Sequence, residues 1–267
     1  MKLLIQGDDF GFTKGITYGI KEAIEHGILT CTGLFTNMPA AELAAEIIKE
    51  HPDFCFGVDF NLVSGYPVSD PKSIPHLVDS NGEFIRSGMR VKDPLYATEE
   101  GRRTLFPKEE MKREVDAQYE KYISLTGKQP AYFHPHSIMP ETYMETIRQL
   151  SRETGIPFSI DLWENSQARS NLKFISMSKK EFNPWDQLNK NTVQDFLDNE
   201  QYYLEGEIAV YACHPGYLDA ELLGLSSLSL ERIKDLEFVL SPQMKAWIKN
   251  QEVQLISYHN WKEDAGA

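Results

Sequence analysis

Acidic and imidazole side chains stand at the ends of several short apolar runs of the chain, or directly after them. The polar residues in these positions are Asp8, Asp9, Asp59, Asn61, His134, His136, His214 and His259. Carboxylates and imidazoles together suit Mg, Zn, Mn, Co or Ni, in contrast to a thiolate site. We therefore predict a site for one divalent metal ion that activates water for hydrolysis.

Asp8 and Asp9 are the most specific part of this set. Adjacent carboxylates beside an apolar run repel each other unless a cation lies near them. We predict that Asp9, Asp59 and His134 bind the metal, that Asp8 accepts a proton from water, and that His214 protonates the leaving group. Candidate substrate-binding residues nearby are His136, Asn61 and His259.

Each of these positions also has a purely structural explanation. Asp8 and Asp9 could cap a turn or a helix. His134 could be a core histidine and His136 an exposed one, since Pro135 alone separates them. The metal site is therefore predicted from the whole set of residues and from their common position after the apolar runs.

The chain has 267 residues with 27 basic and 40 acidic side chains, a net charge of -13. This charge argues against nucleic acid and against an anionic membrane surface as partners. The opening apolar run is too short for a signal peptide, so we expect a cytoplasmic protein. Three scattered cysteines exclude a disulfide framework and are expected to be buried; they are Cys31, Cys55 and Cys213.

Apolar runs of strand length alternate with segments of helical period along the chain. The predicted strands are Leu3–Ile5, Leu29–Phe35, Phe54–Leu62, Ala131–Phe133, Pro157–Ile160, Ile208–Cys213 and Val253–Tyr258. Helices are predicted between most of them, including one from about Thr192 to Leu204. Repeated β-then-α order favours a parallel sheet. We predict one α/β domain over residues 1–267, a TIM-like (β/α) barrel or an incomplete form of it; an open doubly wound sheet is the alternative.

A long excursion interrupts the pattern at about residues 63–107, where prolines and turn dipeptides are frequent. Loops of this length often bind substrate. Basic residues gather in it, and they form either a sugar-phosphate site or a solvated charged surface; they are Arg86, Arg90, Lys92, Arg102 and Arg103. Tyr217 could stack on a sugar face, although aromatic residues in such a chain more often belong to the core.

At these same residues the chain resembles the YdjC-like family of carbohydrate deacetylases, which includes chitooligosaccharide deacetylase. Ile5–Gly11 is similar to the family's Asn-Ala-Asp-Asp-Phe-Gly motif, and Gly57–Leu62 to its Gly-Leu-His-Leu-x-Leu motif. His134–His136 stands in the place of its Asp-Ser-His-x-His-x-His run. Cys213–Asp219 resembles its Cys-His-Pro-Gly-Tyr segment, and the tail with Glu231 and Arg232 also reads like a member.

The resemblance implies a TIM-like barrel, one divalent metal held by an Asp and two His, removal of acetyl groups from N-acetylated sugars, and a homodimer. Carried over, Asp9 and His134 are metal ligands, Asp8 is the base and His214 the motif histidine. Asp59 stands where the family has a histidine, and a second carboxylate makes the site harder and favours Mg or Mn. Tyr132 and Ile138 replace the leading acid and the last histidine of the third motif.

From these observations we predict a metal-dependent N-deacetylase for a chitooligosaccharide or an N-acetylglucosamine disaccharide, either free or phosphorylated. Two alternatives remain from the residues. A metal-dependent phosphoesterase could use the same ligands and acid. A sugar-binding protein on a catalytically decayed scaffold would explain the departures at Asp59 and Ile138.

Overall fold

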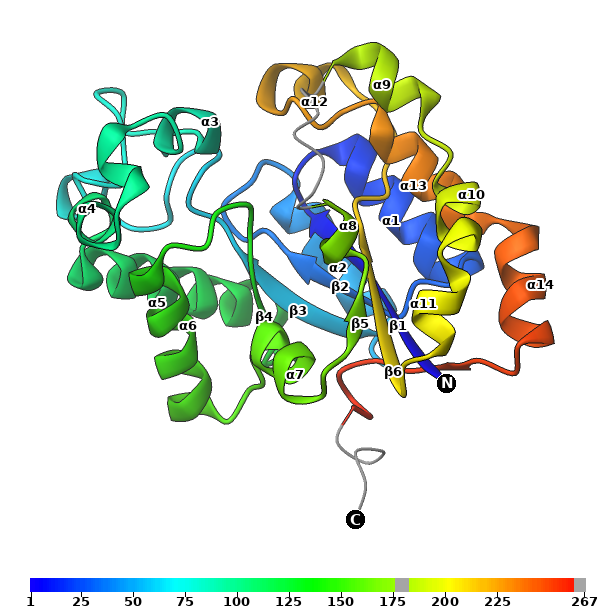
Figure 1. Ribbon diagram of the computed structural model, residues 1–267. Helices are drawn as coiled ribbons and strands as arrows, with labels where there is room; N and C mark the ends of the chain where they lie inside the picture. The colour runs from blue at the N-terminus through cyan, green and yellow to red at the C-terminus, as the bar shows by residue number, and fades with distance from the viewer. Residues whose placement is uncertain (176–182, 262–267) are drawn as a thin grey trace.

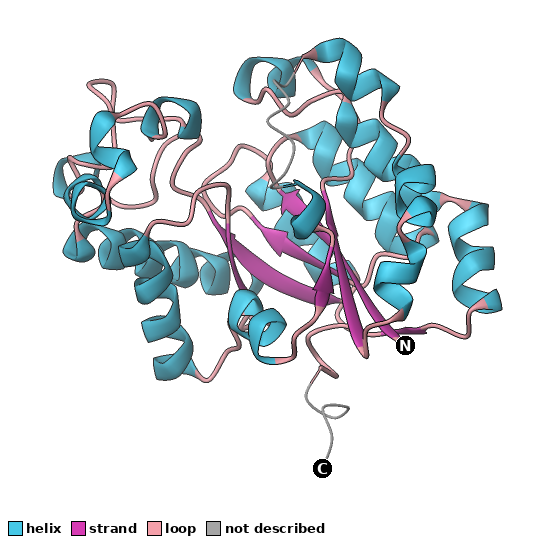
Figure 2. Ribbon diagram, in the orientation of Figure 1, coloured by secondary structure: helices cyan, strands magenta, loops and turns pink. Residues whose placement is uncertain are grey.

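The computed structural model describes residues 1–175 and 183–261. Within them, seven parallel strands form one curled sheet in the order β4-β3-β2-β1-β6-β5, and β7 also pairs with β1. Figure 2 shows the sheet at the centre with helices around it. The strands are β1 (Lys2–Phe10), β2 (Cys31–Leu34), β3 (Cys55–Phe60), β4 (Phe133–Pro135), β5 (Arg169–Ser170), β6 (Ile208–Cys213) and β7 (Gln254–Leu255).

β1 is the central strand, and every residue from Leu3 to Phe10 is buried. It pairs with β6 over Lys2–Gly7 and with β2 from Gln6 onward. The two residues of β7 pair with Lys2 and Leu3, at the beginning of β1 where β2 does not yet pair with it. A strand with neighbours on both sides and a core on both faces must be apolar, which is why its first half reads as a continuous apolar run.

The crossover helices pack outside the sheet, as parallel pairing requires (Figure 1). Thr13 caps the first of them through a hydrogen bond from the backbone of Ile16, and left-handed glycines end two others at Gly127 and Gly155. The longer helices are α1 (Lys14–His26), α2 (Ala41–Glu50), α5 (Lys108–Thr126), α6 (Glu141–Thr154), α13 (Glu231–Leu240) and α14 (Pro242–Asn250).

The barrel is incomplete, which is one of the two forms predicted from the sequence. Phe133 of β4 makes a single bridge to Phe158, and the chain then enters helix α7 (Ser159–Asn165) instead of continuing as a strand. The predicted strand Pro157–Ile160 is therefore wrong. Four apolar residues fit a short strand or the start of a buried helix equally well, and here Ile160 and Trp163 bury a helical face.

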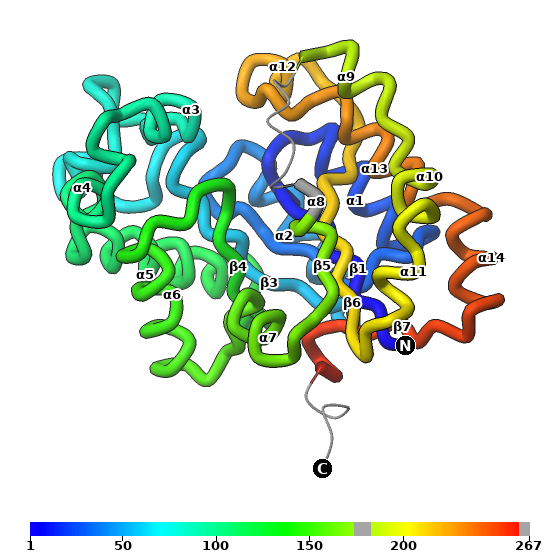
Figure 3. Tube along the Cα trace, in the orientation of Figure 1, coloured from blue at the N-terminus to red at the C-terminus, as the bar shows by residue number. Residues whose placement is uncertain are grey.

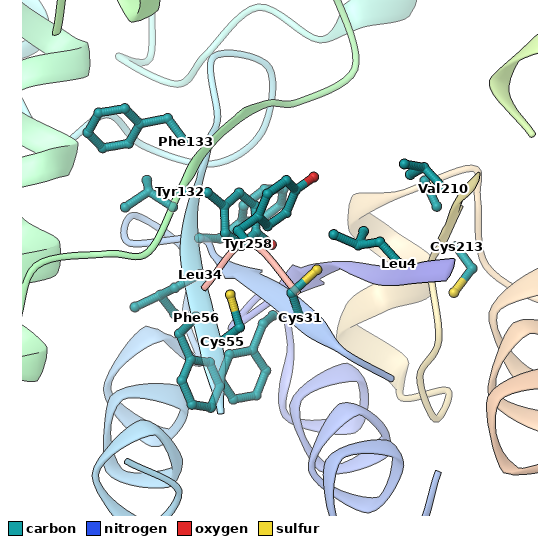
Figure 4. Packing of buried hydrophobic residues seen from close by; sticks show 14 of the residues in the cluster. Leu4, Cys31, Leu34, Cys55, Phe56, Tyr132, Phe133, Val210, Cys213 and Tyr258 are labelled. Carbon is teal, nitrogen blue, oxygen red and sulfur yellow. The ribbon is translucent and has the colours of Figure 1, made fainter. Parts of the chain in front are cut away.

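The interior of the half-barrel is filled by aromatic and sulfur-bearing side chains. Tyr258 lies against Tyr132 with a ring-centroid separation of 4.1 Å, beside Cys31 and Cys55 (Figure 4). Trp261 stacks on Tyr258 with a ring-centroid separation of 5.8 Å. The segment after β7 thus runs across the barrel interior and supplies core that a complete set of strands would otherwise provide. The cysteines are buried and free, as predicted.

The excursion at residues 63–107 folds into short helices that pack beside α5 and α6 (Figure 3). They are η1 (Pro71–Ser73), α3 (Ser87–Arg90), η2 (Pro94–Ala97) and α4 (Glu99–Leu105). Ile74, Leu77, Phe84 and Phe106 are buried in the same apolar cluster as the strands. The excursion therefore shares the main core.

The remaining segments differ from the prediction in detail. The helix expected from Thr192 to Leu204 is interrupted at Asn199. The stretch from Leu162 to Asn191 contains several short elements, and its residues 176–182 lie outside the described part. The shorter elements are α8 (Leu172–Ile175), α9 (Pro184–Asn189), α10 (Thr192–Asp198), α11 (Glu200–Leu204) and α12 (Ala220–Leu225). A search of the described residues finds no helix with the length and apolar character to span a membrane.

Candidate functional site

The predicted catalytic and metal-binding residues lie at one rim of the sheet. Asp8 and Asp9 belong to the last part of β1, and Asp59 of β3 is in register with His134 of β4. His214 directly follows β6. Carboxyl ends of parallel strands share one edge, so residues far apart in sequence meet here. The structure brings all five together.

Asp9 is the most tightly held member of the cluster. Its backbone is left-handed at φ 74°, and its amide donates to Asp59 Oδ2 at 3.1 Å. Its carboxylate lies 2.5 Å from Arg232 Nη2 and 3.1 Å from His136 Nδ1. Burial by itself raises the pKa of Asp9, but Arg232 and His136 outweigh it and hold the pKa well below its usual range. Asp9 is therefore an anion with a buried cationic partner.

Asp8 has the opposite character. Burial raises its pKa to about 8, against the hydrogen bond that Gln6 Nε2 donates to Oδ1 at 2.7 Å, and the neighbouring Asp9 adds to the rise. The other oxygen, Oδ2, lies 3.9 Å from His134 Nε2 and 4.0 Å from His214 Nε2. These separations are longer than hydrogen bonds. Asp8 is thus a carboxyl group that gains and loses a proton near neutral pH, with two imidazoles facing it.

Both imidazoles are neutral at pH 7. His134 Nδ1 shares a hydrogen bond with Ser159 Oγ at 2.7 Å, and burial lowers its pKa to about 3. Burial also lowers the pKa of His214, to about 4. The backbone of His214 donates to Asp235 Oδ2 at 2.8 Å, which fixes the chain where it leaves β6. An imidazolium with so low a pKa gives up its proton readily.

Asp59 lies flat against the neighbouring strand. A Cβ at Gly33 would stand 1.8 Å from Asp59 Oδ1, so only glycine leaves room for this carboxyl. Oδ2 accepts the Asp9 amide, whereas buried Oδ1 has no hydrogen-bond partner. Burial raises the pKa of Asp59 well above its usual value, followed by the charge of Asp8. Both causes favour the neutral form of the Asp59 carboxyl in this arrangement.

The donor atoms of Asp9, Asp59 and His134 fit a divalent ion by type. Asp59 Oδ1 is a buried oxygen without a hydrogen bond, which is the usual mark of an acceptor that could bind a ligand, whereas Asp9 Oδ1 faces His136 Nδ1 at 3.1 Å. Their present arrangement is not that of a closed ligand set: no group of three or more His, Cys, Asp or Glu among residues 1–175 and 183–261 is placed to hold a metal. Arg232 supplies the positive charge at Asp9 instead.

The predicted substrate-binding residues do not all reach this cluster. His136 does, through Asp9. The side chain of Asn61 is used within the loop after β3, where it bonds Asn37 and the backbone of residues 63 and 64. Tyr217 contacts Glu22 on α1. Its prediction as a sugar platform receives no support from this contact, and Asn61 has little capacity left for a substrate.

His259 lies away from the rim, contrary to its prediction as a rim residue. β7 is only two residues long and pairs with the beginning of β1, so the chain after it stays at the opposite end of the sheet. There the backbone of Tyr258 and His259 lies against Cys55, the first residue of β3. The side chain of His259 is exposed.

The basic residues of the excursion are mostly engaged within the protein. Arg102 pairs with Glu141, and Arg103 with Glu99 and Glu145. This is the solvated charged surface that was the alternative to a phosphate site. Arg86 is exposed and donates to the carbonyl of Gly224 at 3.2 Å, which joins the excursion to α12.

Several residues that organise the site do not stand out in the sequence. Arg232 belongs to the tail that resembles the family, and neither Ser159 nor Asp235 is among the predicted site residues. Arg232 lies 223 positions from its partner Asp9. A single signal was available: a basic residue at the start of an amphipathic helix, where it does not complement the helix dipole and so needs another partner.

We expect His134 to stabilise the metal-free protein less at mildly acidic pH than at pH 7. Its pKa is about 3 in the folded protein and near 6.5 when unfolded. The stabilising contribution is therefore complete above pH 6.5 and is lost as pH falls toward 3, about 1.4 kcal/mol per pH unit. Chemical denaturation of wild type and His134→Gln with a chelator present, at pH 7 and pH 5, measures this contribution. The stability of wild type relative to His134→Gln should be lower at pH 5 than at pH 7, while the exposed control His26→Gln should match wild type; a difference between wild type and His134→Gln that does not change with pH would contradict this.

Two comparisons with known proteins show the family of this chain, and a third shows its fold. The model of the family described as YdjC-like protein matches residues 2–250. Carbohydrate deacetylase 2 of Listeria innocua serovar 6a is 32% identical and carbohydrate deacetylase of Geobacillus stearothermophilus 31% identical, each over 97% of this chain, with 98% and 97% of the relative covered. The crystal structure of a putative cellobiose-phosphate cleavage protein from Enterococcus faecalis V583 superposes with a TM-score of 0.76 at 22% identity, covering 97% of this chain and 98% of that one, and shares the fold. The chain belongs to the YdjC-like protein family.

Proposed function

We propose that this protein is a carbohydrate deacetylase that hydrolyses the acetamido group of small N-acetylated sugars. Curated relatives with this name align over nearly the whole chain. The observation that carries the proposal is the position of Asp8. A buried carboxyl with a pKa of about 8 is a stronger base than an ordinary aspartate, and Oδ2 faces two imidazoles.

In the proposed reaction, water attacks the carbonyl carbon of the acetamido group and gives one proton to Asp8. The carbon–nitrogen bond then breaks, and the sugar nitrogen takes up the proton that Asp8 received from water, passed on through His214, whose Nε2 lies 4.0 Å from Asp8 Oδ2. Acetate and the free amine leave. The low pKa of His214 makes its protonated form a strong acid, which suits delivery to a poor leaving group.

One divalent ion is part of the proposal, held by Asp9, Asp59 and His134. When bound, it would lower the pKa of water and polarise the acetyl carbonyl. Asp59 replaces an imidazole by an oxygen donor, which favours magnesium or manganese. A cation beside Asp59 and Asp8 would also favour their ionised forms, and so prepare Asp8 to accept a proton.

The test is release of acetate from chitooligosaccharides and N-acetylglucosamine disaccharides, with and without a phosphate group, by protein loaded with each of Mg, Mn, Zn, Co and Ni. We expect acetate from at least one sugar and loss of the activity with a chelator. Assay of inorganic phosphate in the same samples tests the phosphoesterase alternative. Absence of acetate under every condition would contradict the proposal.

The second candidate is a sugar-binding protein without turnover, and one observation favours it. Arg232 already pairs with the Asp9 carboxylate, and burial raises the pKa of Asp59 well above its usual value, so less negative charge is left in the cluster for a metal ion to neutralise. Calorimetric titration of the same sugars into chelator-treated protein separates the two. Binding without acetate release, unchanged in His134→Ala, would favour the binding protein.

A further inference from the structure

A chain of buried hydrogen bonds leads from helix α7 to Asp8. Trp163 Nε1 donates to Tyr258 Oη at 2.8 Å, and Tyr258 Oη donates to Gln6 Oε1 at 2.7 Å. Gln6 Nε2 donates in turn to Asp8 Oδ1 at 2.7 Å. All four residues are less than 7% exposed. The three bonds join elements that are up to 252 positions apart in sequence.

The direction of every bond in this chain is determined by its first member. An indole N–H can only donate, so the oxygen of Tyr258 accepts from Trp163 and turns its own proton toward Gln6. Gln6 must then present its carbonyl oxygen to Tyr258 and its NH2 group to Asp8. An isolated glutamine amide has two orientations of similar energy, and this chain selects the one that donates to Asp8.

The same helix also holds His134. Ser159 and Trp163 are four residues apart in α7 and thus lie on one helical face, which is turned toward the barrel interior. Ser159 Oγ bonds His134 Nδ1, and the ring of Trp163 lies 5.5 Å from the imidazole. The Asp8–His134 pair, with 3.9 Å between Oδ2 and Nε2, is therefore set from both sides by one short helix.

We propose that Gln6, Tyr258 and Trp163 are positioning residues that hold Asp8 Oδ1, so that Oδ2 stays directed at His134 and His214. This inference rests on the proposed function in that Asp8 is taken as the base. The three hydrogen bonds from Trp163 to Asp8 form a relay. Without this relay, the Asp8 carboxyl would be free to rotate, and the Gln6 amide would be free to turn its oxygen toward that carboxyl. A misplaced base lowers the rate of the chemical step more than it weakens substrate binding.

The first test is spectroscopic and independent of turnover. The chain has four tryptophans, so the indole N–H signals in an ¹⁵N-correlated NMR spectrum are few, and Trp163→Phe identifies the one from Trp163. We expect Asp8→Ala to shift this signal, and we expect Tyr258→Phe to abolish that response in the double variant. Trp247, whose indole bonds Glu200, is the control that should not move.

The second test is kinetic. On a sugar that releases acetate, Tyr258→Phe should lower kcat about tenfold or more and leave KM unchanged, since it removes one hydroxyl and keeps the ring. Tyr203→Phe is the matched control, because it also removes a hydroxyl from a buried ring but lies in α11 outside the relay. Its kcat should remain that of wild type.

The outcomes separate the relay from the proposed function. An NMR response that depends on Tyr258, in a protein with no deacetylase activity, supports the relay and rejects the function. Deacetylase activity with an unchanged kcat in Tyr258→Phe overturns the relay while the function stands. The relay is also overturned if Asp8→Ala still shifts the Trp163 signal in the Tyr258→Phe background. The shift would then be transmitted through space by the nearby imidazole of His134 and not through Tyr258.

Discussion

Arg232→Met is expected to lower the free energy of unfolding by about 3–5 kcal/mol at pH 7, the usual cost of removing one partner of a buried ion pair. Arg232 and Asp9 are 2% and 1% exposed, and the pair is the shortest contact of Asp9. Removing the guanidinium leaves a buried carboxylate beside Asp59 and Asp8. Denaturation by urea with a chelator present measures the loss.

Two comparisons make this prediction specific. Asp9→Asn in the Arg232→Met background should recover part of the lost stability, since it removes the unpaired charge. Lowering the pH should also reduce the deficit, because Asp9 without its partner takes up a proton at a higher pH than in wild type. Arg103→Met, which breaks a surface pair, should have a much smaller effect. A deficit that is unchanged by Asp9→Asn would show that packing, rather than charge, is lost.

Asp8→Asn is expected to lower kcat for deacetylation by about 10²–10⁴-fold, the range for loss of a general base. It should do so without destabilising the protein at pH 7. Burial raises the pKa of Asp8 to about 8, so the metal-free fold holds it as a neutral carboxyl, which an amide resembles. The hydrogen bond from Gln6 Nε2 can be made to the Asn oxygen.

The control for this variant is Asp161→Asn, since Asp161 pairs with Arg148 outside the rim. It should retain the wild-type kcat. The contribution of Asp8 to stability should decline as pH rises from about 4 to about 8, because the unfolded chain ionises Asp8 while the folded protein keeps the proton. The stability of wild type relative to Asp8→Asn should therefore fall over this pH range. Acetate release at the wild-type rate would exclude Asp8 as the base.

The rim of the site was predictable from sequence because parallel strands place their carboxyl ends together. Asp8, Asp9, Asp59 and His134 could thus be grouped without knowing the order of the strands. His259 could not be placed in this way. The strand before it, β7, is only two residues long and pairs with the beginning of β1. The periodicity of a sequence does not show at which position along a neighbouring strand the pairing occurs.

The residues that contact the rim residues and set their pKa values and positions were not predictable from the sequence. Arg232 reaches Asp9 from a helix that packs on α1, and Tyr258 reaches Gln6 through the barrel interior. Such contacts depend on the three-dimensional path of the chain, whereas local patterns report only which face of an element is buried. The short helix α7 was missed for a related reason, since its buried residues are too few to show a helical period.

The central place of β1 in the sheet has a consequence for biosynthesis. β1 leaves the ribosome about 200 residues before its neighbour β6, at Ile208–Cys213. Until then one edge of a strand whose first half is apolar has no partner, and nascent chains in this condition are prone to aggregate. We expect productive folding to be largely post-translational and assisted by chaperones that shield this edge.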